Sequence, residues 1–337
     1  MFKKIIAFSS ILLTCLLVGF FVVKNEITHF MHQPLSLDQP SLIKVSHGQS
    51  LQGMLLELQS KELINTSYSQ RLVHRLYPEL SKLKAGTYQI QPAMSLEEVL
   101  KLMVSGKEYQ FSLTLVEGST WREWRKELAN NPDLIHTMDA LSDDEIASKL
   151  GLEHDSLEGM FLAETYHFTQ GESDIELLSR AHRTLLKVLD SAWQTRAEKL
   201  PLATQYQALI LASIVEKETA IADERPKVAS VFINRLQRKM RLQTDPTVIY
   251  GLGDKYDGNI TRRDLRTPTP YNTYVISGLP PTPIAMVGRS AIEAALQPEQ
   301  TSYLYFVASG HGGHVFSKTL VEHNRAVKQY LKVLREK

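Results

Sequence analysis

An uninterrupted apolar segment near the start of the chain predicts a membrane-spanning helix. Residues 5–23 contain no charged side chain, and a helix of that length is about 28 Å long, close to the hydrocarbon thickness of a bilayer. Lys3 and Lys4 precede the segment and favour a cytoplasmic N-terminus. A cleaved signal peptide is the alternative, but its apolar region is usually shorter and small residues mark its cleavage site. We therefore expect residues 1–24 to form an uncleaved, single-pass anchor.

After this anchor, the pattern predicts a linker and a small α+β module. Residues 25–40 are polar and contain two prolines, as is typical of a linker. Within the module, at residues 41–107, Ser95 and Glu98 form a capping box for a helix that stops at Gly106. The predicted elements are strands at residues 42–45 and 84–90 and helices at residues 51–59 and 96–104. This strand–turn–helix pattern resembles LysM modules, which bind glycans containing N-acetylglucosamine, and a spacer domain is the alternative.

The remainder of the chain, residues 108–337, predicts a larger mixed α+β domain with a helical insert near residues 140–158. The expected strands are at residues 111–115 and 302–307, and the expected helices include residues 174–199, a shorter helix opened by Pro201 that runs through 209–218, and residues 319–335. The predicted fold class is therefore α+β, with a transmembrane helix, a LysM-like module and a catalytic domain in that order.

The charge balance and the cysteine count argue against several classes of protein. The 337 residues include 38 lysines and arginines and 37 aspartates and glutamates, which gives a formal net charge of +1. Because no basic excess is available to hold a phosphate backbone, we expect no nucleic-acid partner. Cys15 is the single cysteine, so neither a disulfide framework nor a cysteine-based zinc site can form within one chain.

Two glutamates end an apolar helix in the second half of the chain. Residues 208–215 carry no charge, and on a 3.6-residue period Glu218 continues the stripe of Leu211 and Ile214, whereas Glu216 points elsewhere. Desolvation on such a stripe should raise the pKa of Glu218. A carboxyl that is protonated near neutral pH is what a general acid for glycosidic cleavage requires. The alternative is a structural ion pair of Glu218 with Lys217, Arg225 or Arg235.

Two polar segments further along the chain suit sugar binding. Gln243 and Asp245 alternate with apolar neighbours, although Asp245 could instead cap the next helix. Tyr271, Asn272 and Thr273 precede a loop that contains three prolines. Aromatic faces stack on pyranose rings and amides bond hydroxyl groups, but an ordinary irregular loop would fit this sequence too.

His311 and His314 stand three residues apart on a glycine-rich turn and could bind zinc together with Glu322 or His323. The glycines leave such a turn flexible, and no HExxH helix is present. We favour a turn whose histidines bond the backbone or the substrate, and we expect neither a metal nor a cofactor. The sequence also contains no G-x-S-x-G motif and no glycine-rich phosphate loop.

Several segments together resemble the endolytic murein transglycosylase family, also called YceG-like. They are residues 157–166, 212–219, 228–236, 242–251, 271–284 and 316–324. The resemblance implies cleavage of MurNAc-β-1,4-GlcNAc bonds within nascent peptidoglycan strands by a lyase reaction that leaves 1,6-anhydro-MurNAc ends. It assigns the catalytic role to Glu218, which agrees with the stripe argument. Glu164, in the first of these segments, is a candidate cleft residue or a helix cap.

In this interpretation Glu218 protonates the glycosidic oxygen, the C6 hydroxyl of the sugar attacks C1, and ionised Glu218 accepts the hydroxyl proton. Two other functions stay open, namely a membrane-tethered, non-catalytic glycan-binding scaffold and a muramidase that uses water with Asp245 as second carboxylate. The resemblance also implies an inner-membrane protein with a periplasmic catalytic domain that works beside peptidoglycan synthases.

Overall fold

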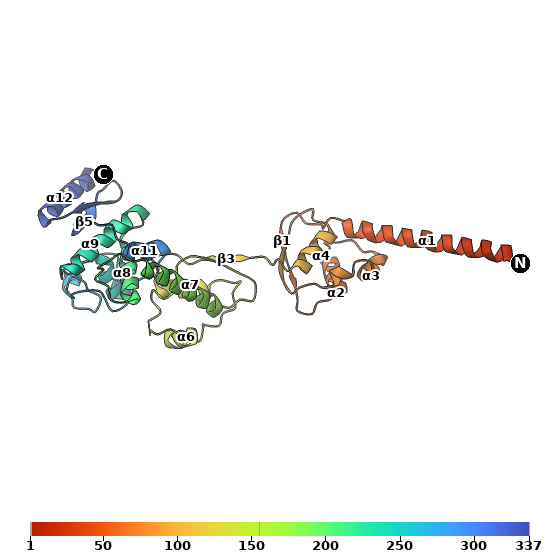
Figure 1. The fold of residues 1–337 in the computed structure, drawn as a ribbon, viewed down its shortest axis with the longest axis horizontal. Coiled ribbons are helices and arrows are strands. Elements are labelled where there is room, and N and C mark those ends of the chain that lie inside the picture. Colours follow the sequence, from red (N-terminus) through yellow and green to blue (C-terminus); the bar gives the residue numbers. More distant parts are fainter. Residues whose placement is uncertain (1, 155, 337) are drawn as a thin grey trace. The chain divides into compact units, whose positions relative to one another are not determined.

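The computed structural model describes residues 2–154 and 156–336, and the chain divides into two compact units (Figure 1). The first unit comprises Met1–Phe111 and His167–Gln170, and the second comprises Ser112–Tyr166 and Gly171–Lys337. Each sheet of the described residues has two strands, so the architecture is mixed α+β with a long apolar helix at its start. Residue 155, inside the predicted helical insert, lies outside the described residues, as do the first and last residues.

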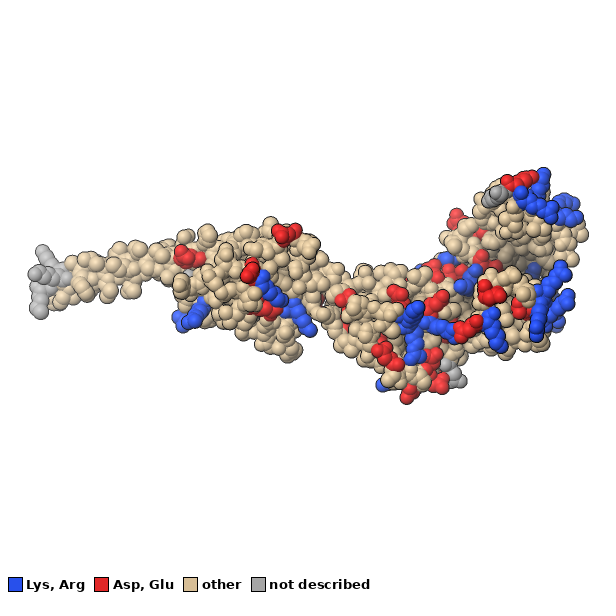
Figure 2. Space-filling model, turned by 180° about the vertical axis from the view of Figure 1, so that it is seen from behind, with Lys and Arg blue, Asp and Glu red and all other residues tan. Residues whose placement is uncertain are grey.

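The first helix, α1 (Phe2–His32), is longer than its apolar segment. The large apolar side chains between Ile5 and Val23 are exposed, and Figure 2 shows this part of the helix without charged groups. Among the described residues it is the one helix long and apolar enough to cross a membrane, as an anchor or a signal sequence would be. Its last turns, in the range predicted as a linker, bury Ile27 and Met31 in the core of the first unit.

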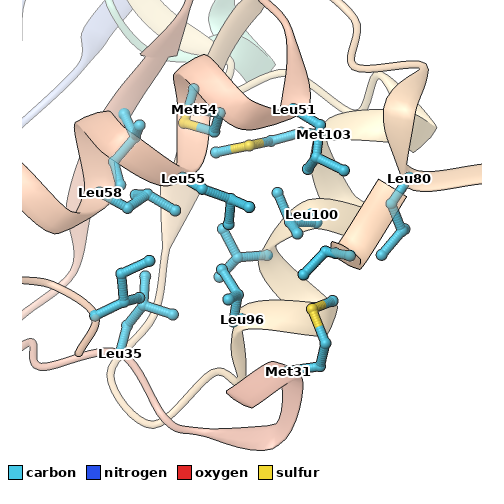
Figure 3. Packing of buried hydrophobic residues seen from close by; sticks show 14 of the residues in the cluster. Met31, Leu35, Leu51, Met54, Leu55, Leu58, Leu80, Leu96, Leu100 and Met103 are labelled. Atoms are coloured by element: carbon cyan, nitrogen blue, oxygen red, sulfur yellow. The ribbon is translucent and has the colours of Figure 1, made fainter. Parts of the chain in front are cut away.

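The first unit is an antiparallel strand pair packed with helices. Its elements are β1 (Ser41–Val45), α2 (Leu51–Ser60), η1 (Tyr68–Leu72), α3 (Val73–Leu76), η2 (Pro78–Ser81), β2 (Gly86–Ile90) and α4 (Leu96–Ser105). Leucine and methionine side chains from α1, α2 and α4 meet in its core (Figure 3). The predicted capping box of Ser95 and Glu98 is confirmed, and α4 ends at Gly106 in the left-handed conformation with φ 75°.

The second unit contains most of the remaining elements. They are β3 (Phe111–Thr114), α5 (Trp121–Ala129), α6 (Asp143–Leu150), β4 (Thr165–Phe168), α7 (Asp174–Gln194), α8 (Gln205–Glu218), η3 (Ala222–Glu224), α9 (Arg225–Gln237), α10 (Asp245–Leu252), η4 (Gly253–Lys255), η5 (Asp264–Arg266), α11 (Arg289–Leu296), β5 (Tyr305–Ala308), β6 (His314–Ser317) and α12 (Leu320–Glu336). The chain passes between the units at β3 and β4, which pair with each other.

Helix α8 forms the centre of this unit because α7, α9 and α11 all pack against it. Every residue from Ala208 to Glu216 is buried, which explains the absence of charge along most of this helix. The hydroxyl of Thr204 caps its start by accepting from the N–H of Gln207, so α8 begins at Gln205, four residues after the predicted opening at Pro201. The β5–β6 hairpin pairs Tyr305 with Ser317.

Candidate functional site

The last residue of α8 is Glu218, and it faces a different side of the helix from Glu216. Leu211 and Ile214, which precede Glu218 on the same stripe, are completely buried. The hydroxyl of Thr244, just before α10, donates a hydrogen bond to Oε1 of Glu218. The predicted stripe therefore places this carboxyl at the end of an apolar row and against the start of α10.

Burial raises the pKa of Glu218 to about 7. The hydrogen bond from Thr244 opposes this rise, the negative charge of Asp245 adds to it, and His314 and Arg235 oppose it. Desolvation is the largest of these effects because the charged form of a carboxyl loses its hydration in a buried position. A large fraction of Glu218 is consequently protonated near neutral pH, as a general acid must be.

The bases that could have neutralised Glu218 are engaged elsewhere. Arg225 pairs with Glu216 at 2.7 Å, Lys217 donates to a backbone carbonyl at 2.9 Å, and Arg235 donates to two backbone carbonyls at 2.6 Å. Within the described part of the chain, no ion pair within 4.0 Å includes Glu218. The structural ion pair considered for Glu218 is instead made by its neighbour two residues earlier.

Glu216 has the surroundings of a structural carboxylate. Its side chain is almost completely buried, and its second oxygen accepts a hydrogen bond from the backbone N–H of Gly288 at 3.0 Å. Burial raises the pKa of Glu216, whereas the Gly288 N–H and the charge of Arg225 lower it. Arg225 also reaches Glu117 at 3.2 Å. These contacts tie α8 to the start of α9 and to the residue that precedes α11.

A cavity of about 350 Å³ lies beside the carboxyl of Glu218, and we refer to it as the Glu218 cavity. Its lining residues are Glu218, Phe232, Arg235, Leu242, Gln243, Thr244, Asp245, Tyr274, Tyr305, Phe306, Leu320 and His323. Such a volume is in the range of small-ligand sites. Figure 2 shows that the second unit is hollowed near its C-terminal end and that lysine and arginine side chains border the hollow.

Two of the predicted sugar-binding residues, Gln243 and Asp245, line the Glu218 cavity. Gln243 is exposed and has a positive φ of 49°. Asp245 is the first residue of α10, after the cap position at Thr244, and its carboxylate accepts a hydrogen bond from the hydroxyl of Tyr274 at 2.6 Å. Both side chains therefore lie where a bound sugar could reach them.

The other predicted residues lie outside the lining of this cavity. The hydroxyl of Tyr271 bonds that of Thr282 at 2.9 Å, and the amide of Asn272 donates to two backbone carbonyls at 3.0 and 2.7 Å. The hydroxyl of Thr273 accepts from the N–H that precedes α10 at 3.0 Å. Glu164 is exposed, and its backbone carbonyl accepts from the N–H of Leu115, directly after β3, at 3.1 Å. Thr273 therefore supports the residue bonded to Glu218, whereas Asn272 supports its own loop at residues 264–267.

The sequence did not single out Tyr305, and it offered His323 only as a zinc ligand; both line the cavity, as does Tyr274, which follows Thr273 directly. The rings of Tyr305 and His323 stack with centroids 5.2 Å apart. Desolvation, and after it the charge of Arg235, lowers the pKa of His323, and its buried Nδ1 has no hydrogen-bond partner among the described residues. No local signal places Tyr305 and His323 at this cavity, because β5 and α12 reach α8 only through the fold.

The two histidines of the glycine-rich turn have different surroundings. His314 binds Glu224 twice, through its Nδ1 at 2.7 Å and its backbone N–H at 2.8 Å, whereas His311 is exposed. Over the described residues, no group of three or more histidine, cysteine, aspartate or glutamate side chains is arranged to hold a metal ion. His314 therefore acts here as a partner of Glu224, and its charge lowers the pKa of Glu218, against the larger effect of burial.

Comparisons with known proteins give a consistent result. The model of the YceG-like family matches residues 43–329. The endolytic murein transglycosylase of Bacillus subtilis is 31% identical over 90% of this chain and 89% of its own length. That of Streptococcus pneumoniae is 28% identical, and the match covers 76% of this chain but only 52% of that protein. A crystal structure of a YceG-like protein from Listeria monocytogenes aligns with a TM-score of 0.54 and 32% identity, over 85% of this chain and 99% of that one.

Proposed function

Since the chain belongs to the YceG-like family, we propose that it is an endolytic murein transglycosylase with Glu218 as its catalytic acid and base. The observation that carries this proposal is the unpaired, desolvated carboxyl of Glu218, whose pKa of about 7 leaves it protonated in part at neutral pH. It borders a cavity lined by hydroxyl, amide and aromatic groups, the groups that bind sugar rings. The substrate we assign is the MurNAc-β-1,4-GlcNAc bond within nascent glycan strands.

The proposed reaction needs one carboxyl. Protonated Glu218 donates its proton to the glycosidic oxygen as the C1–O bond breaks, and the transition state has oxocarbenium character. The C6 hydroxyl of the same MurNAc residue attacks C1, which is favoured because the reacting groups belong to one molecule. The carboxylate of Glu218 accepts the hydroxyl proton, so that the enzyme returns to its starting form. The products are a 1,6-anhydro-MurNAc end and a free 4-hydroxyl, and no water is consumed.

Asp245 is the residue on which a water-using muramidase would depend. It lines the same cavity, but one of its oxygens accepts the hydroxyl proton of Tyr274. One such bond leaves a carboxylate able to accept a proton from water through its other lone pairs. The lyase and the hydrolase are therefore distinguished by the ends of their products.

Digestion of purified sacculi by the full-length protein in detergent tests the proposal. Mass spectrometry should find released glycans with anhydro ends, which weigh one water less than reducing ends. Glu218→Gln should abolish release while the variant still binds sacculi and still unfolds in one cooperative thermal transition, at no lower a temperature than the unaltered protein. Unchanged release by Glu218→Gln would refute the assigned residue, and exclusively reducing ends would refute the lyase reaction.

The long apolar helix α1 supports a membrane location for this activity. We propose that α1 anchors the protein in the inner membrane as a single span, with a cytoplasmic N-terminus and the second unit on the periplasmic side. Peptidoglycan synthases that make the nascent strands are the partners we expect there. For the first unit we propose a LysM-like role in holding glycan. Two observations support this role: helices stand between the two strands in the sequence, and β1 pairs antiparallel with β2.

A further inference from the structure

Helix α1 connects its apolar segment to the first unit without a break. The apolar segment ends at Val23, and the side chain of Ile27 is already completely buried in the core of the first unit. Four helical residues rise about 6 Å, which is roughly the thickness of one headgroup layer of a bilayer. If α1 spans a membrane, as proposed above, the first unit therefore begins inside the headgroup layer.

The part of the first unit at that level is the corner formed by η1 and α3. Helix η1 packs against α1 and against α3, and Figure 1 shows α3 at the end of the unit nearest to the N-terminus. Tyr68 is fully exposed. It lines a hollow of about 590 Å³ together with Glu26, His29 and Phe30 of α1, so this corner adjoins the turns of α1 that directly follow the apolar segment.

The same corner carries exposed positive charge. Arg71 on η1 and Arg75 on α3 are exposed, and neither has an ion-pair partner among the described residues. Lys24 adds a third base at the end of the apolar segment, and Glu26 is the acidic residue of the hollow. Figure 2 shows blue side chains on the part of the first unit nearest to the exposed helix.

We propose that this corner, through Tyr68, Arg71 and Arg75, binds the anionic headgroups of the membrane that holds α1. Tyrosine is enriched at the membrane–water interface because its ring and hydroxyl suit the two sides of that boundary. Basic side chains close to an anionic bilayer surface are attracted to it within a Debye length. The contact fixes the height of the first unit above the bilayer and limits its rotation about α1.

The test uses the full-length protein with Cys15→Ser and a fluorophore on Tyr68→Cys, reconstituted into phosphatidylcholine vesicles with or without phosphatidylglycerol. Headgroup-labelled quencher lipids report contact with the interface. The control label is on Lys107→Cys, an exposed position between α4 and β3. It follows the end of α4 opposite to Leu96, whose N–H bonds Gln33 directly after α1. We expect quenching at position 68 to exceed that at position 107 at least threefold in vesicles that contain phosphatidylglycerol.

The double variant Arg71→Gln and Arg75→Gln should reduce the quenching at position 68 about twofold with phosphatidylglycerol and leave it unchanged without it. Equal quenching at positions 68 and 107 in protein that floats with the vesicles would overturn the proposal. An undiminished signal in the double variant would overturn the assigned role of the arginines. Protein that fails to float would instead contradict the anchoring on which the proposal rests, so the two failures are distinguishable.

Discussion

The hydrogen bond from Thr244 to Glu218 offers a direct test of how the structure sets the acidity of the proposed acid. Thr244→Val removes the hydroxyl but keeps the branched shape of the side chain. The bond favours the ionised carboxyl, so its loss should raise the pKa of Glu218 above about 7. Hydrogen bonds to charged groups contribute about 1.5–3 kcal/mol. The lower end of this range corresponds to about one pH unit.

The assay is the rate of anhydro-glycan release from sacculi as a function of pH. Because the protonated form of Glu218 starts the reaction, activity is present below the pKa and is lost as the pH rises through it. In Thr244→Val this loss should occur about one pH unit higher than in the unaltered protein. Thr184→Val is the matched control, since that hydroxyl donates only to a backbone carbonyl within α7. An unchanged midpoint in Thr244→Val would refute the assignment of that limb to Glu218.

Further predictions follow from individual contacts. Burial raises the folded-state pKa of Glu218 from 4.5 to about 7, so the protein loses stability as the pH rises through 7. Glu218→Gln removes this loss and should therefore raise the melting temperature more at pH 8.5 than at pH 5.5. An equal gain at both pH values would contradict this. Glu216→Gln removes the buried carboxylate of Arg225 and leaves its guanidinium only the half-exposed Glu117. The change should cost about 3 kcal/mol in urea unfolding of the second unit, and a loss below about 1 kcal/mol would disprove this. Ser95→Ala should cost the first unit about 1 kcal/mol in the same measurement, because the capping box is lost, and Glu98→Gln should cost less. His323→Phe keeps a ring against Tyr305 of β5 but removes the unpartnered Nδ1. The value of kcat/KM should fall several-fold, and the midpoint of the pH–activity curve should not change. A displaced midpoint would assign His323 to proton transfer instead.

The sequence predicted the elements with strong local signals. The apolar segment, the capping box at Ser95 and the uncharged helix before Glu218 are each encoded by neighbouring residues, and all are present in the structure. The end of α7 at Gln194 rather than residue 199 and the strand β6 were not predicted. Helix ends have weak signals, and β6 follows directly on glycines and is formed by its pairing with β5.

Part of the site could not be read from the sequence, because it depends on contacts between distant segments. Thr244 stands 26 positions from Glu218 in the sequence but bonds it in the structure. The hydroxyl of the buried Thr273 accepts a hydrogen bond from the backbone N–H of Thr244 and so fixes its position. His323 comes from the last helix of the chain. Sequence patterns drew attention to the segment of Gln243 and Asp245, which lines the Glu218 cavity. They do not distinguish a residue that faces the cavity from one, such as Asn272, that supports a loop.

The spacing of the two glutamates at the end of α8 explains how one helix can supply both a structural and a reactive carboxyl. Residues two positions apart lie about 200° apart around a helix axis. Glu216 therefore faces the guanidinium of Arg225 and the N–H of Gly288, whereas Glu218 faces the cavity. Glu216 holds Arg225, and Arg235, which lines the cavity, donates to two backbone carbonyls, so no ion pair within 4.0 Å among the described residues lowers the pKa of Glu218. The acidity of Glu218 thus depends chiefly on its desolvation, whereas that of Glu216 depends also on the charge of Arg225.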